Sequence, residues 1–150
     1  MESKKNEILS QIKHIMQLMD FEEMETDSID FPIAFVQKGP SGLNKVFLVV
    51  DSKDLDVQNL QVFKTNARAW CVQYLDANFK KNCGLNLIIL HQKEFTEDAM
   101  KKFIDKSSLN VPILQSITAI SINNLSVTQS KTWVVIGSIK NALKELKKGW

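Results

Sequence analysis

The chain has 150 residues, of which 44% are hydrophobic and 24% charged, and its formal net charge is +2. This length and this composition predict one globular domain, residues 1–150, that is large enough to have a substantial core. No apolar run approaches the ~20 residues that a membrane helix needs, so we expect no membrane association and a cytoplasmic location. Two cysteines and two histidines argue against a disulfide framework and against a zinc site.

The charge is distributed unevenly along the chain. Residues 1–56 contain 6 lysines and 11 acidic residues, a balance of −5, whereas residues 57–150 contain 13 basic and 6 acidic residues, a balance of +7. Either the two halves attract each other, or the basic half faces an acidic partner such as nucleic acid.

The first predicted element is an amphipathic helix over residues 4–19. Its apolar stripe recurs at helical spacing and is expected to face the core, with a partner surface as the alternative; the stripe consists of Ile8, Ile12, Ile15, Met16 and Met19. Residues 20–30 are acidic and predict a solvated connection or a short edge strand.

Residues 30–38 and 43–50 predict a hairpin around the turn at residues 39–42. If those four residues are the whole loop, Lys38 lies opposite Leu43 and Asp30 opposite Asp51, with Lys53 two residues further on the same face. Two carboxylates and an ammonium group at one end of a sheet can hold a divalent metal and a hydroxide.

The same register assigns the apolar residues of the hairpin to two faces. It places Ile33 and Phe35 beside Leu48, and Ala34 and Val36 beside Phe47. Because both faces are apolar, we expect helices to cover both.

The second half of the chain continues an alternation of helices and strands. We expect a helix over 56–81, in which Cys71 lies in an apolar stripe, a parallel strand over 85–90 followed by His91, and a helix over 96–106. A strand over 118–122, a last strand over 132–136 stopped by Gly137, and a helix beginning at Ser138 follow. The prediction is a mixed sheet of about five strands flanked by helices on both faces.

Residues 4–90 resemble the core of the PD-(D/E)XK nuclease superfamily, with an acid opening one strand and Asp51-Ser52-Lys53 closing the next. The resemblance implies that Asp30 and Asp51 bind Mg²⁺, that Lys53 stabilises the attacking hydroxide, and that Glu7 contributes from outside.

The sequence departs from the family's pattern at several points, two of them around the first acid. The family usually has a strand before the acid-bearing one, where this chain offers only residues 22–29, a mostly polar segment, and Asp30 precedes its proline rather than following it. An alternative role for Asp51 and Ser52 is to cap the helix that follows.

The remainder of the chain favours a binding role. In size and in its lack of a catalytic signature, the chain also resembles small accessory subunits encoded beside ATPase or nuclease partners in bacterial defence or DNA-processing systems. Docking onto a protein partner or nucleic acid is expected from Lys144, Lys147 and Lys148 and from Trp150. Our leading hypothesis is a non-catalytic nuclease-like subunit of a nucleic-acid-handling or defence assembly. The alternative is an active metal-dependent nuclease that cleaves phosphodiester bonds.

Overall fold

A computed structural model describes residues 2–26, 33–39, 44–51, 60–75, 83–91, 102–104, 113–122, 127–129 and 134–148. The described elements are α1 (Glu2–Leu18), β1 (Glu22–Glu25), β2 (Ile33–Gln37), β3 (Asn44–Asp51), α2 (Leu60–Leu75), β4 (Cys83–His91), β5 (Ile113–Ser121), β6 (Val127–Gln129) and α4 (Val134–Lys148). The described strands form one sheet in the order β1-β2-β3-β4-β5-β6. The predicted α/β class with a mixed sheet is confirmed.

Strand directions divide the sheet into a parallel centre and antiparallel edges. β3 pairs with β4 and β4 pairs with β5 in parallel, whereas the β1–β2, β2–β3 and β5–β6 pairs are antiparallel. β3 and β4 pair in parallel and are joined in sequence through α2, which is the predicted crossover connection. The acidic segment after α1 was predicted to be either a solvated connection or a short edge strand. It contains the edge strand β1.

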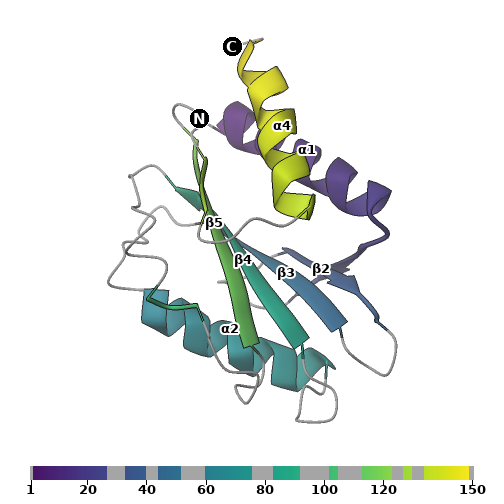
Figure 1. Ribbon diagram of the computed structural model, residues 1–150, viewed down its shortest axis with the longest axis vertical. Coiled ribbons are helices and arrows are strands. Elements are labelled where there is room, and N and C mark those ends of the chain that lie inside the picture. The colour runs from purple at the N-terminus through teal and green to yellow at the C-terminus, as the bar shows by residue number, and fades with distance from the viewer. Residues whose placement is uncertain are drawn as a thin grey trace.

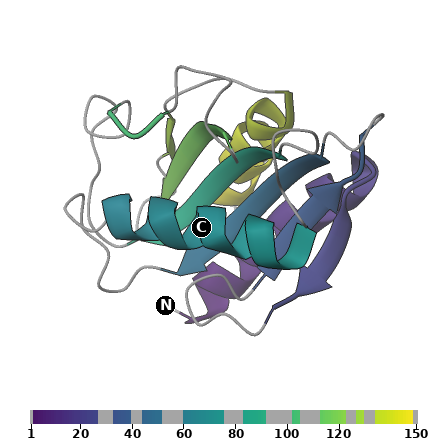
Figure 2. The same ribbon diagram turned by 90° about the horizontal axis from the view of Figure 1, so that it is seen from below.

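The molecule has three layers, with α2 on one face of the sheet and α1 and α4 side by side on the other (Figures 1 and 2). Leu60, Ala67 and Trp70 of α2 pack on the sheet in one cluster of buried residues, which we call the α2-side core. Ile12 of α1 and Leu143 of α4 belong to a second cluster, the α1/α4-side core. Burial on both faces explains the continuous apolar runs 46–50 of β3 and 87–90 of β4.

α1 ends in a motif that fixes the direction of the chain into β1. The amide of Phe21 donates to the carbonyl of Met16 at 2.9 Å, and the amide of Asp20 donates to that of Gln17 at 3.1 Å. Asp20 has a φ of 62°, the left-handed conformation that such a helix end requires. The Gln37 side chain of β2 donates to the carbonyl of Met19 at 2.9 Å and so satisfies another group at the helix end.

The predicted register of the hairpin is wrong by one residue. Ile33 pairs with Val49 rather than with Leu48, and Phe35 pairs with Phe47. Since side chains alternate across a strand, this shift exchanges the partners on both faces. Ala34 therefore shares the α2-side core with Leu48, whereas Phe35 and Phe47 lie together in the α1/α4-side core.

The predictions for the end of the chain need two corrections. Residues 134–136 begin α4 instead of ending a strand, and Gly137 lies inside this helix. The antiparallel position beside β5 is occupied by β6, in which Val127 pairs with Ile120. The run Val134-Val135-Ile136 favours a strand by local propensity, but it also continues the helical spacing that leads through Ile139 and Leu143.

The connection between β4 and β5 is described only at residues 102–104. These three residues form a turn and a bend, so the helix predicted over 96–106 does not include them, and the rest of that range lies outside the described residues. Phe103 and Ile104 pack against the α2-side core.

Candidate functional site

The carboxyl ends of the three parallel strands bring polar residues to one edge of the sheet. β3 ends at Asp51, which pairs with Leu90, and β4 ends at His91, which pairs with Ser121 at the end of β5. In open α/β sheets, ligands bind at this edge where the order of the strands reverses. Here β3, β4 and β5 follow one another in sequence order, so the parallel strands supply no such reversal between them.

The residues of the predicted metal site are only partly described. Asp51 is the last residue of β3, and Asp30 and Lys53 lie outside the described residues. The prediction that Asp30 lies opposite Asp51 depended on the register that β2 and β3 do not adopt. Among the described residues, no group of three His, Cys, Asp or Glu side chains is placed to hold a metal ion. Glu7 is exposed on α1.

The capping role of Asp51 and Ser52 stays a prediction. Asp51 belongs to β3, and α2 is described from Leu60 onward, with residues 52–59 between them outside the described residues.

A cluster of buried polar side chains, Asn86 and Ser116, links the three parallel strands and was not predicted from the sequence. The Asn86 amide of β4 donates to the carbonyl of Val46 in β3 at 3.2 Å and to that of Gly84 at 3.3 Å. The Ser116 hydroxyl of β5 donates to Asn86 Oδ1 at 2.5 Å. Asn86 is 2% exposed and Ser116 is fully buried. Their hydrogen bonds within the protein therefore replace the hydrogen bonds to water that both side chains lose on folding.

An irregularity in β5 places these polar side chains together. The pairing steps from Leu85–Leu114 to Asn86–Ser116, so Gln115 is the extra residue of a bulge. A Cβ at Gly84 would lie 2.8 Å from the Gln115 Cδ, which shows how closely that side chain crosses the β4 backbone. The sequence signals were a single Asn inside an apolar strand run and the adjacent Gln115-Ser116 pair, which interrupt the expected apolar pattern.

Thr118 extends the same polar group but has no hydrogen-bond partner. Its side chain is fully buried two residues after Ser116, and its Oγ1 makes no hydrogen bond. The donors and the acceptor of Asn86 are all engaged, so Asn86 and Ser116 link the parallel strands together, whereas the buried Thr118 hydroxyl stays unpaired.

The α2 side of the sheet is closed by packed side chains. Trp70 is 4% exposed and stacks at a tilt against Tyr74, with ring centroids 5.2 Å apart. Cys71 is fully buried, in agreement with its predicted place in the apolar stripe. Lys64 is 9% exposed, and its ammonium donates to the carbonyl of Phe103 at 2.6 Å, which attaches the β4–β5 connection to α2. The aromatic residue Trp70 therefore belongs to the core and is not available to stack on a base.

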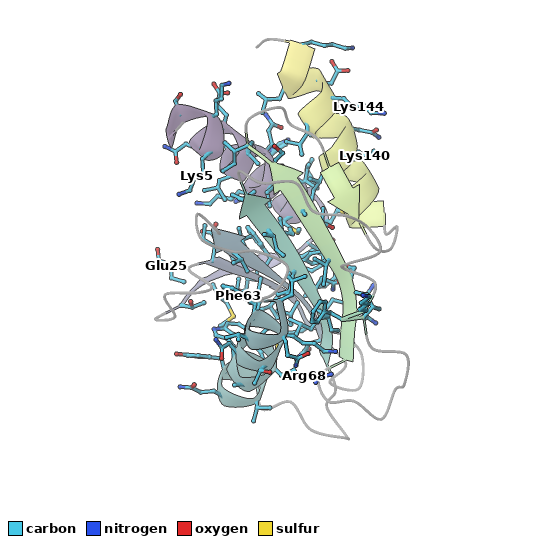
Figure 3. The ribbon with its side chains drawn as sticks, turned by 90° about the vertical axis from the view of Figure 1, so that its left-hand side faces the viewer. Lys5, Glu25, Phe63, Arg68, Lys140 and Lys144 are labelled. Atoms are coloured by element: carbon cyan, nitrogen blue, oxygen red, sulfur yellow. The ribbon has the colours of Figure 1, made fainter. Side chains whose placement is uncertain are left out.

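The basic side of α4 lies on the surface, as predicted. Lys140 and Lys144 are exposed and project from the outer side of α4 (Figure 3). Lys148 is exposed and forms an ion pair with Glu145 at 3.0 Å. Lys147 is part of α4, but its side chain is outside the described part of the structure, as is Trp150.

Comparison of the chain with models of protein families, with curated proteins and with solved structures finds no match. Among the described residues, no helix is both long and apolar enough to cross a membrane.

Proposed function

We propose that this protein is a non-catalytic, nuclease-like α/β subunit that binds nucleic acid within a larger assembly. The order of elements from α1 to β4 supports the nuclease-like part of the proposal. A helix, three antiparallel strands, a crossover helix and a parallel strand follow one another. β1 lies between α1 and β2, which agrees with the strand that the family has between its first helix and its acid-bearing strand.

The single observation that carries the binding role is the row of exposed lysines on α4. Lys140, Lys144 and Lys148 recur every four residues, so they step along the helix by about 6 Å. Lysines placed in this way can neutralise successive phosphates of a nucleic acid backbone without reading its bases. Three such contacts correspond to a salt dependence of log K with a slope of about −2 to −3.

The non-catalytic part of the proposal is supported by the β2–β3 register. The shared metal site was expected because Asp30 would lie directly opposite Asp51, and the observed pairing removes that reason. Binding without cleavage requires only the exposed lysines.

Fluorescence anisotropy with labelled single-stranded and double-stranded oligonucleotides, over a series of KCl concentrations, tests the proposal. The variant K140E/K144E should weaken binding at least about tenfold and reduce the magnitude of the salt slope by about 2. The matched control K38E/K45E changes the net charge equally at two exposed lysines near the β2–β3 turn and should retain most of the affinity. Equal losses in both variants, or no binding by the wild type, would show that α4 is not the nucleic acid site.

The alternative, active metal-dependent phosphodiester hydrolysis, is favoured by the position of Asp51. It ends β3, where the nuclease resemblance places the second metal-binding acid. Calorimetric titration with Mn²⁺, run beside D51A and followed by a nuclease assay, distinguishes the two functions. Mn²⁺ binding and cleavage that both disappear in D51A would replace the non-catalytic proposal with the enzymatic one.

A further inference from the structure

A carboxylate interrupts the row of exposed lysines on α4. Glu145 directly follows Lys144 and precedes Lys148 by three residues, a separation that makes two side chains neighbours on the surface of a helix. The Lys148 ammonium donates to Glu145 Oε1 at 3.0 Å. Both side chains are 73% exposed, so this ion pair lies in the surface that α4 presents to solvent.

The two preceding lysines of the row, Lys140 and Lys144, differ from Lys148 in their surroundings. Both are exposed, and neither forms an ion pair with another described residue. Their side chains project from the outer side of α4 (Figure 3). A phosphate can therefore contact Lys140 and Lys144 directly, whereas it must compete with the Glu145 carboxylate for Lys148.

We propose that Glu145 restricts the nucleic acid site of α4 to Lys140 and Lys144, because it neutralises Lys148, and that it thereby keeps the binding of a phosphate backbone weak. This inference rests on the nucleic acid binding proposed above and adds the residue that sets its strength. Glu145 is a positioning residue, since it acts through Lys148 and does not itself contact the phosphates.

The salt dependence of binding distinguishes two phosphate contacts from three. Each lysine that neutralises a phosphate releases a counterion from the nucleic acid. If Lys148 exchanges the Glu145 carboxylate for a phosphate, the freed carboxylate attracts a cation, so this exchange releases no net ion. With a DNA duplex, the slope of log K against log salt concentration is about −1.8 for two contacts and about −2.7 for three. The wild type should show the smaller magnitude.

Fluorescence anisotropy with a labelled duplex, over a series of KCl concentrations, tests this role with the variant E145Q. Glutamine keeps the shape of the side chain and removes its charge, so Lys148 becomes a third phosphate contact. E145Q should bind about three- to fivefold more tightly at low salt, since an exposed ion pair changes an equilibrium constant by at most about fivefold. Its slope should increase in magnitude by about 0.9.

Two controls separate the ion pair from a general effect of charge. E25Q makes the same change of net charge at an exposed residue of β1, on the side of the molecule opposite Lys140 and Lys144 (Figure 3), and should bind like the wild type. In a K148Q background, E145Q should leave the salt slope unchanged, because no third lysine is released. An equal increase in slope with and without Lys148, or no increase in E145Q, would overturn the proposal.

Elution from a heparin column separates failure of this inference from failure of the proposed function. Heparin is a sulfated polyanion that contains no nucleotide, so it reports the charge of α4 without requiring nucleic acid binding. A wild type that binds no oligonucleotide would refute the proposed function. The role of Glu145 towards polyanions would still be decided by whether E145Q elutes at higher salt than E25Q, and elution of both variants together would overturn it.

Discussion

Replacing Thr118 with valine should stabilise the protein. The Thr118 side chain is fully buried in β5, and its Oγ1 has no hydrogen-bond partner. A buried hydroxyl without a partner loses its hydrogen bonds to water on folding, a cost of about 1–3 kcal/mol. Valine has a similar shape and suits a strand, so T118V should remove most of this cost. Allowing for imperfect packing of the new methyl group, we expect a gain of about 1 kcal/mol.

The measurement is guanidinium chloride unfolding of the wild type and T118V, accompanied by thermal unfolding. A gain of about 1 kcal/mol should raise the midpoint temperature by about 2–4 °C in a domain of this size, with an unchanged denaturant slope.

The neighbouring residue Ser116 provides the control. S116A removes a hydroxyl of equal burial that does have a partner, Asn86 Oδ1. S116A should therefore destabilise the protein by about 1–3 kcal/mol, because the Asn86 oxygen loses its donor. If T118V is destabilised as much as S116A, the Thr118 hydroxyl has a hydrogen-bond partner in solution and the reasoning about its cost is wrong.

Three further substitutions test local features of the fold by chemical denaturation. D20G should gain about 0.5–1 kcal/mol because glycine adopts the φ of 62° without strain, and an equal or larger gain in D20A would contradict this explanation. G84A should cost about 1 kcal/mol in the wild type but little in a Q115A background, since the new Cβ meets the Gln115 side chain, and additive effects would refute that contact. Breaking the exposed Lys13–Glu23 pair with K13A should change stability by less than about 1 kcal/mol, and a larger loss would reveal a role in docking β1.

The types of the long elements could be predicted from local pattern. The stripe containing Ile8, Ile12 and Met16 predicted the buried face of α1, and these three residues are fully buried. The apolar run from Leu85 to Leu90 predicted a strand buried on both faces, and β4 has that environment. Both follow from periodicity, because a segment that must bury one or both faces shows this in a few consecutive residues.

The proposed chemistry was harder to predict than the elements. The row containing Lys140 and Lys144 was found because a helix with one apolar side leaves its polar side in water. The link between Asn86 and Ser116 was not found, since it joins residues 30 positions apart and depends on a bulge in β5. A single polar residue within an apolar run shows that a partner is needed, but it does not identify the partner.

The sequence by itself determined where α1, α2, β3 and β4 form and that the sheet is covered on both faces. Only the tertiary structure decided that Ile33 pairs with Val49, and that β6 rather than residues 134–136 lies beside β5. The physical reason is that periodicity is a property of one segment, whereas register is selected by packing between segments. A shift of one residue leaves the pattern within each strand unchanged and yet exchanges every cross-strand neighbour.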